Sequence, residues 1–179
     1  MSEVEELISK YRQFVAMPWQ KNIAGAQKVL FVVYDPVQER RVRLRLDEFQ
    51  IATRAAGHKW HLVDLTDSFA HWMGSHRYRE AYFESPEDLM LALNDYTEHV
   101  ARQLREALID PSVDENTVVA VLGLATLFGL TRASTVIEKA ASAIQGRLLM
   151  FFPGRHENGN YRLLDAKDGW NYLAIPITA

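Results

Sequence analysis

Histidine and aspartate side chains near residue 60 are of the types that bind transition metals. His58, His61 and Asp64 lie close together around a short apolar run. That run, at 59–65, predicts a strand, in which residues three apart point to opposite faces of the sheet. His58 and His61 would then be unable to bind one ion together, because the ligands of a zinc site surround a single point. We therefore predict no metal site and two ordinary histidines.

A second group of polar residues lies near the C-terminus. Asp165, Asp168 and Gly169 separate two apolar runs, and Asn158-Gly159 precedes the first of them. Glycine tolerates positive φ, and Asn and Asp bond to neighbouring backbone groups, so both segments are typical of tight turns. Paired metal or acid–base roles for the two aspartates have weaker support. We predict turns at both places.

The segment after the first apolar run is where a phosphate loop would lie. A Walker A loop needs glycines, whose amides surround phosphate, and a lysine. Residues 34–39 contain no glycine, Asp35 would repel phosphate, and Pro36 has no N–H to donate. This excludes the usual P-loop route of ATP hydrolysis. A nucleotide could still bind at the carboxyl ends of parallel strands. That edge would be lined by Tyr34, Asp35, Asp64 and Gly123.

Other catalytic patterns are missing from the sequence. The chain has no cysteine and no Gly-x-Ser-x-Gly segment, so thiolate chemistry and the usual serine nucleophile have no residues to carry them. His156 and Glu157 could transfer protons, but one of each in a polar loop is common. We predict a protein that is not an enzyme, with no catalytic residue and no cofactor.

Arginines alternate with apolar residues at 41–46. Period two predicts an extended segment with its cationic groups on one face. Such a face could contact phosphate or an acidic partner, or it could be a solvated edge strand whose charges prevent unwanted pairing. Because Glu39, Asp47 and Glu48 flank the run, we favour the solvated edge or a protein partner over DNA. The candidate contact residues are Arg41, Arg43 and Arg45.

Aromatic residues and arginine also gather at 72–83. Trp72, Tyr78 and Arg79 are of the types that anchor protein interfaces. A helix that packs on the sheet would have the same composition. Both interpretations stay open.

The elements that would position these residues alternate in type. Short, continuously apolar runs predict buried strands at 28–34, 59–65, 117–122 and 147–152. Between them, apolar spacing and caps predict helices at 2–17, 47–56, 66–73, 85–108 and 133–144. A hairpin of 161–164 with 170–177 would follow. This order predicts an α/β fold: a mostly parallel sheet between helices, Rossmann-like or degenerate P-loop-like, with a C-terminal antiparallel hairpin at the sheet edge.

Length and composition set further bounds. The 179 residues predict one domain, 1–179, with an N-terminal helix in 1–18 and the last strand plus hairpin in 146–179. A net charge of −3 provides no global attraction for nucleic acid or an anionic membrane. No apolar run reaches the roughly 20 residues that cross a bilayer, and the acidic start is unlike a secretory signal. We expect a cytoplasmic protein.

Long stretches of the chain resemble the BrxB family of BREX phage-resistance systems. The C-terminal run RLLMFFPG, then Glu157-Asn158 and NYRLLDAKDGWNYLAIPI, is similar to the signature that ends this family. Further similarity covers 33–36, 41–45 and 124–132, so the resemblance extends over most of the chain.

The resemblance implies a role more than a reaction. BREX systems methylate host DNA and block phage replication with several proteins, among them a methyltransferase, a large ATPase and the phosphatase-like PglZ. A BrxB-like chain would be a small accessory component without catalytic residues, and PglZ is the partner that the family implies. The alternatives are a subunit that contacts nucleic acid through 41–45, and a cryptic nucleotide-binding protein without Walker A.

Overall fold

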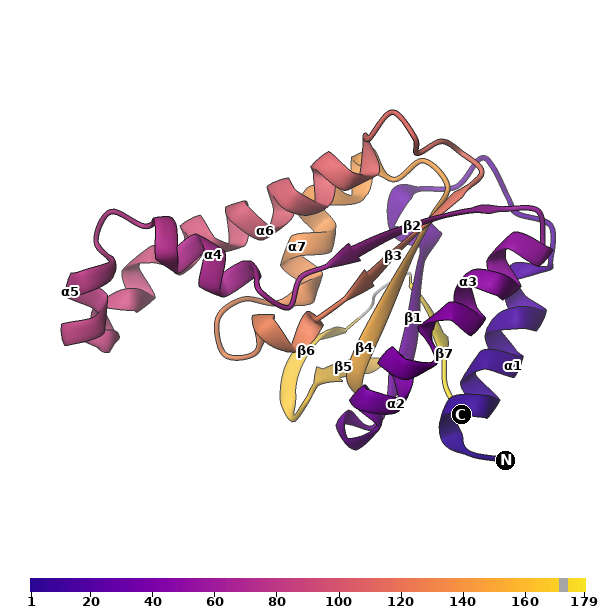
Figure 1. The fold of residues 1–179 in the computed structure, drawn as a ribbon, viewed down its shortest axis with the longest axis horizontal. Helices are drawn as coiled ribbons and strands as arrows, with labels where there is room; N and C mark the ends of the chain where they lie inside the picture. The colour runs from indigo at the N-terminus through magenta and orange to yellow at the C-terminus, as the bar shows by residue number, and fades with distance from the viewer. Residues whose placement is uncertain (171–173) are drawn as a thin grey trace.

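The centre of the molecule is a parallel sheet, shown in a computed structural model that describes residues 1–170 and 174–179 (Figure 1). Its strands are β1 (Val29–Tyr34), β2 (Lys59–Asp64), β3 (Thr117–Leu122), β4 (Arg147–Glu157) and β7 (Ile175–Ile177). Their order is β2-β3-β4-β1-β7, and each neighbouring pair is parallel. The predicted mostly parallel α/β sheet is therefore confirmed.

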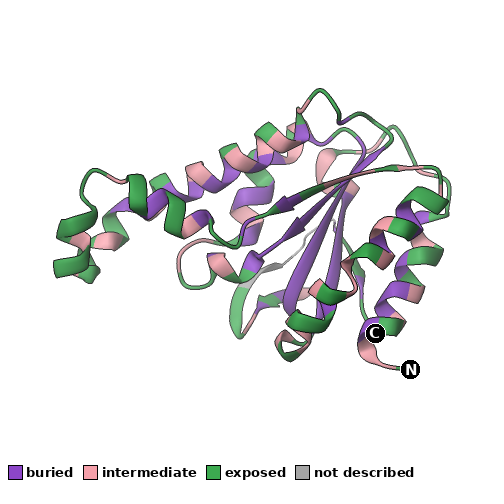
Figure 2. Ribbon diagram, in the orientation of Figure 1, coloured by how far each residue is buried: buried purple, intermediate pink, exposed green. Residues whose placement is uncertain are grey.

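Helices cover both faces of this sheet. The α-helices of the described chain are α1 (Glu3–Val15), α2 (Glu39–Leu44), α3 (Leu46–Ala55), α4 (Ser68–Ser75), α5 (Arg79–Glu84), α6 (Leu93–Leu108) and α7 (Ala133–Ala140), and all of them except α5 contribute buried residues to the core. One core lies between the sheet and α1 and α3, and the other lies between the sheet and α6 and α7. β1 and β3 are buried at every position because both of their faces meet a helical layer (Figure 2).

The start of the chain follows its local signals. Ser2 caps α1 in a capping box with Glu5, which satisfies amides that have no partner inside the helix. Gly57 ends α3 with a φ of 86°, where other residues are strained.

No helix in the described part of the chain has the length and apolar character that a bilayer span requires.

The predicted strand at 41–46 is wrong, because these residues are helical. α2 covers most of the segment and α3 begins at Leu46, so Asp47 lies inside a helix and does not cap it. Arg and Leu are good helix formers, and Glu39 pairs with Arg43 one turn later at 2.7 Å. Six alternating residues are too short a pattern to outweigh these contacts.

The C-terminal segment forms antiparallel strands at a different register from the predicted one. β4 continues through the Asn158-Gly159 turn into β5 (Asn160–Leu163), and β5 pairs with β6 (Ala166–Trp170). The Asn158-Gly159 turn is confirmed, with positive φ at both residues. The second turn lies at Leu164-Asp165, so Asp168 and Gly169 are in a strand. The predicted strand 170–177 is also wrong in part: β7 is parallel to β1, and 171–173 lie outside the described residues.

A helical projection leaves the body of the molecule between β2 and β3. It contains α4, α5, a 3-10 helix (Pro86–Ala92) and the start of α6, so the predicted helix at 85–108 begins with a 3-10 segment. Figure 1 shows α5 at the far end, well away from the sheet. We call residues 76–92 the helical arm. Most of its residues are exposed (Figure 2).

Candidate functional site

A hydrogen-bonded network joins the carboxyl ends of β1 and β2. The Tyr34 hydroxyl donates to Glu39 at 2.5 Å, and Arg43 Nε donates to the other oxygen of the same carboxylate at 2.7 Å. Arg43 also reaches Asp64 at 3.4 Å and the Thr66 hydroxyl at 2.9 Å. Arg43 on α2 therefore links residues from two strands that are not neighbours in the sheet.

The ionisation of these groups is set by burial and by their partners. Burial and the bond to Glu39 raise the pKa of Tyr34 above its usual range, so the phenol stays a neutral donor. Burial opposes the charge on Asp64, but hydrogen bonds from Thr66 and then Arg43 hold the pKa of that carboxyl below its usual value. The network therefore consists of satisfied groups that bind one another.

Of the four residues predicted to line a ligand-binding edge, three lie close together and Asp35 does not. Tyr34 and Asp64 meet through Arg43, and Gly123 packs so closely on Thr66 that a Cβ there would lie 2.4 Å from the Thr66 nitrogen. Asp35 instead lines a separate hollow. Sequence reasoning missed Glu39 and Arg43 here because it placed 41–46 in a strand.

A hollow of about 780 Å³ opens beside the end of β1. We call it the arginine crevice. It is lined by Asp35, Pro36, Phe128, Arg155, Glu157, Arg162, Leu164 and Asp165. Arg155 and Arg162 lie opposite each other in the register of β4 and β5. The sequence carried a signal for this pair, because a two-residue turn at Asn158-Gly159 places 155 opposite 162.

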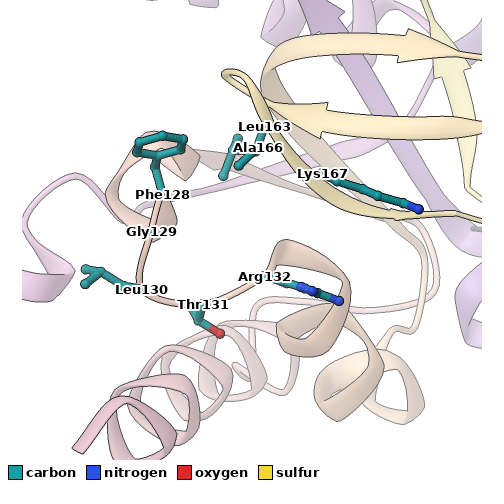
Figure 3. A pocket seen from close by; sticks show the side chains of 8 residues that line it. All are labelled: Phe128, Gly129, Leu130, Thr131, Arg132, Leu163, Ala166 and Lys167. Carbon is teal, nitrogen blue, oxygen red and sulfur yellow. The ribbon is translucent and has the colours of Figure 1, made fainter. Parts of the chain in front are cut away.

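A smaller pocket of about 250 Å³ lies next to the arginine crevice (Figure 3). The loop between β3 and α7 forms one side, and the β5–β6 hairpin forms the other. Arg132 and Lys167 supply its cationic groups, and Leu163 and Ala166 lie near the Phe128 ring. Phe128 lines both this pocket and the crevice, so it is a shared wall.

The arginines at 41–45 do not form the predicted cationic face. Arg43 pairs with Glu39 and Asp64, and Arg45 pairs with Glu48 at 2.5 Å and with Glu5 at 3.3 Å. Arg41 is exposed. Two of the three charges are thus matched by carboxylates of the same chain, which weakens any attraction for phosphate.

The aromatic candidates divide between the base and the surface of the helical arm. Trp72 is buried against Tyr96 and Phe69, so it anchors the arm to the body. Tyr78 is exposed, and Arg79 donates to the Gly74 carbonyl at 3.0 Å. Of the three, Tyr78 and Arg79 remain accessible to a partner.

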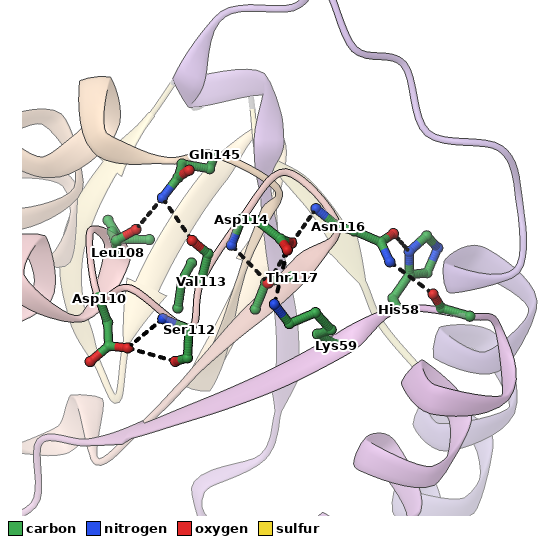
Figure 4. Close-up of polar contacts among 11 residues, drawn as sticks. His58, Lys59, Leu108, Asp110, Ser112, Val113, Asp114, Asn116, Thr117 and Gln145 are labelled. Atoms are coloured by element: carbon green, nitrogen blue, oxygen red, sulfur yellow. Dashed lines mark hydrogen bonds and ion pairs between the residues drawn. The ribbon is translucent and has the colours of Figure 1, made fainter.

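The histidine near β2 has structural partners at the amino end of the sheet (Figure 4). His58 bonds to Asn116 at 2.6 Å and stacks on Trp19 with ring centres 3.6 Å apart. Lys59 and Asp114 pair nearby at 2.9 Å. The described residues contain no cluster of three or more His, Asp or Glu placed to hold a metal ion.

Comparison with protein-family models, curated proteins and solved structures finds no match to this chain.

Proposed function

We propose that this chain is a non-enzymatic adaptor of a BREX antiphage complex and that its helical arm binds a protein partner. One observation carries the proposal: large apolar side chains are exposed on a projection that makes few contacts with its own domain. Phe83 is 64% exposed and Leu91 85%, and Tyr78 and Met90 are also exposed. Exposed apolar groups on a projecting element are typical of protein contact sites.

The charge of the arm supports a protein partner over nucleic acid. Its acidic residues outnumber Arg77 and Arg79; they are Glu80, Glu84, Glu87 and Asp88. Phosphate would be repelled by this surface. A groove with an apolar floor and a basic rim would complement both the apolar side chains and the carboxylates.

The resemblance to the BrxB family supplies the candidate partner. PglZ is the BREX component that this resemblance implies, and the other BREX proteins are the next candidates. Contact with nucleic acid through Arg41, Arg43 and Arg45 has less support, because Arg43 and Arg45 are paired with carboxylates of the same chain.

Co-purification with PglZ tests the adaptor proposal. We expect the double variant Phe83→Asp, Leu91→Asp to weaken the complex at least about tenfold, because buried apolar anchors dominate interface energy. Ile109→Asp is the matched control, since Ile109 is also 64% exposed but lies at the far end of α6. Equal binding by the double variant and the wild type would rule out the arm as the contact.

A further inference from the structure

The arginine crevice lies where an open α/β sheet binds ligands. The chain leaves β1 toward α2 and α3 on one face, whereas it leaves β3 toward α7 on the other face. β1 and β3 flank β4 in the sheet. Loops that diverge at the carboxyl ends leave a crevice at this switch point. Its volume of about 780 Å³ is within the common range of small-molecule sites.

A row of cations crosses the hairpin beside this crevice. Arg162 pairs in register with Arg155 on one side and with Lys167 on the other. Like charges placed directly opposite destabilise a sheet. Within the described part of the chain the Arg155 side chain has no ion pair, and the Arg162 guanidinium donates to the Asp165 carbonyl at 3.2 Å. An anion between the two guanidinium groups would remove their repulsion and accept forked hydrogen bonds.

Carboxylates in the same crevice limit the charge of that anion. Asp35, Glu157 and Asp165 line it together with the two arginines. A polyanion such as duplex DNA would meet three carboxylates, which disfavours it. A ligand with one phosphate and several hydrogen-bond donors would satisfy both sets of charges, because carboxylates accept bonds from hydroxyl and amino groups.

An aromatic ring completes the set of contacts. Phe128 lines the crevice and is 42% exposed, so one part of its ring is accessible. A nucleobase can stack on the accessible face of such a ring. We propose that the arginine crevice binds a nucleoside monophosphate. Arg155 and Arg162 hold the phosphate, Phe128 contacts the base, and the carboxylates accept bonds from the sugar hydroxyls or base amino groups.

Calorimetric titration of the purified chain with AMP, GMP, CMP and UMP tests this site. We expect at least one to bind, and both Arg155→Ala and Arg162→Ala to weaken it at least about tenfold, since each removes charged hydrogen bonds. Arg54→Ala, at an exposed arginine on α3, is the matched control and should bind as the wild type does. Thermal unfolding without ligand checks that each variant is folded.

Phe128→Leu separates contact with the base from contact with the phosphate. This variant should bind the nucleotide more weakly and inorganic phosphate unchanged. Absence of binding by all four monophosphates would overturn the proposal, as would unchanged affinity in both arginine variants. Tighter binding of duplex DNA or of an acidic peptide would overturn it too. Phe83→Asp, Leu91→Asp should leave nucleotide binding intact, so this site and the adaptor role can fail separately.

Discussion

Gly123 shows how one residue without a side chain joins two loops at the carboxyl edge of the sheet. Its φ is 82°, a conformation that glycine adopts at little cost. A Cβ would also lie 2.8 Å from the Thr66 hydroxyl oxygen and closer still to the Thr66 backbone. Two separate costs, backbone strain and a steric clash, therefore meet at this position.

A pair of glycine variants separates these two costs. Gly129 has a similar φ of 73°, but nothing lies within 4 Å of its ideal Cβ. We expect Gly129→Ala to lower the free energy of unfolding by about 1 kcal/mol, from strain alone. Gly123→Ala should lower it by at least about 2 kcal/mol, because overpacking adds to the strain. Urea denaturation measures both, and equal losses would contradict the close packing on Thr66.

At the scale of single elements, the strands were the most predictable part of the chain. β1, β3 and the first half of β4 are continuous apolar runs, and burial on both faces explains that composition. α2 was mispredicted, because its alternating pattern was weighed without the tertiary contacts of Arg43. The turn at Leu164 was missed because a leucine with positive φ gives no local signal.

Two residues of α2 offer a direct test of whether this segment is a helix or a strand. In a strand, Val42 and Leu44 would share a buried face; in the observed helix, Val42 is fully buried and Leu44 is 78% exposed. We expect Val42→Ala to lower the free energy of unfolding by about 1–3 kcal/mol. Leu44→Ala should change it by less than about 0.5 kcal/mol. Similar losses for both variants would favour the strand.

The candidate site was predictable only in part, because its residues come from several elements whose relative positions the sequence does not state directly. The carboxyl ends of parallel strands meet at one edge, so Tyr34, Asp64 and Gly123 could be grouped from their positions alone. Predicting the arginine crevice requires a further step. The register of the two strands has to be worked out from the Asn158-Gly159 turn, and that register places Arg155 beside Arg162. Phe128 enters from a loop after β3, and no periodicity marks its place.

At the scale of the whole molecule, the body and the helical arm differ in how much they bury. β3 is buried at all of its positions, whereas α5 has no buried residue. Local opening is easiest where few apolar contacts are lost. We expect amide hydrogens of α5 to exchange much faster than those of β3 in hydrogen-exchange mass spectrometry. Addition of the partner protein should slow exchange in the arm and leave α7 unchanged; an arm already as protected as β3 would contradict this.

The position of β1 in the sheet has a consequence for co-translational folding. Its two neighbours in the sheet are β4 and β7, which lie more than a hundred residues later in the chain. At about 5–20 residues per second, synthesis from the end of β1 to the start of β4 takes roughly 6–23 s. Throughout that time VLFVVY lacks both of the strands with which it pairs in the folded protein. During that interval α1, which shares a core with β1 in the folded protein and is already synthesised, is available to cover one face of this apolar segment.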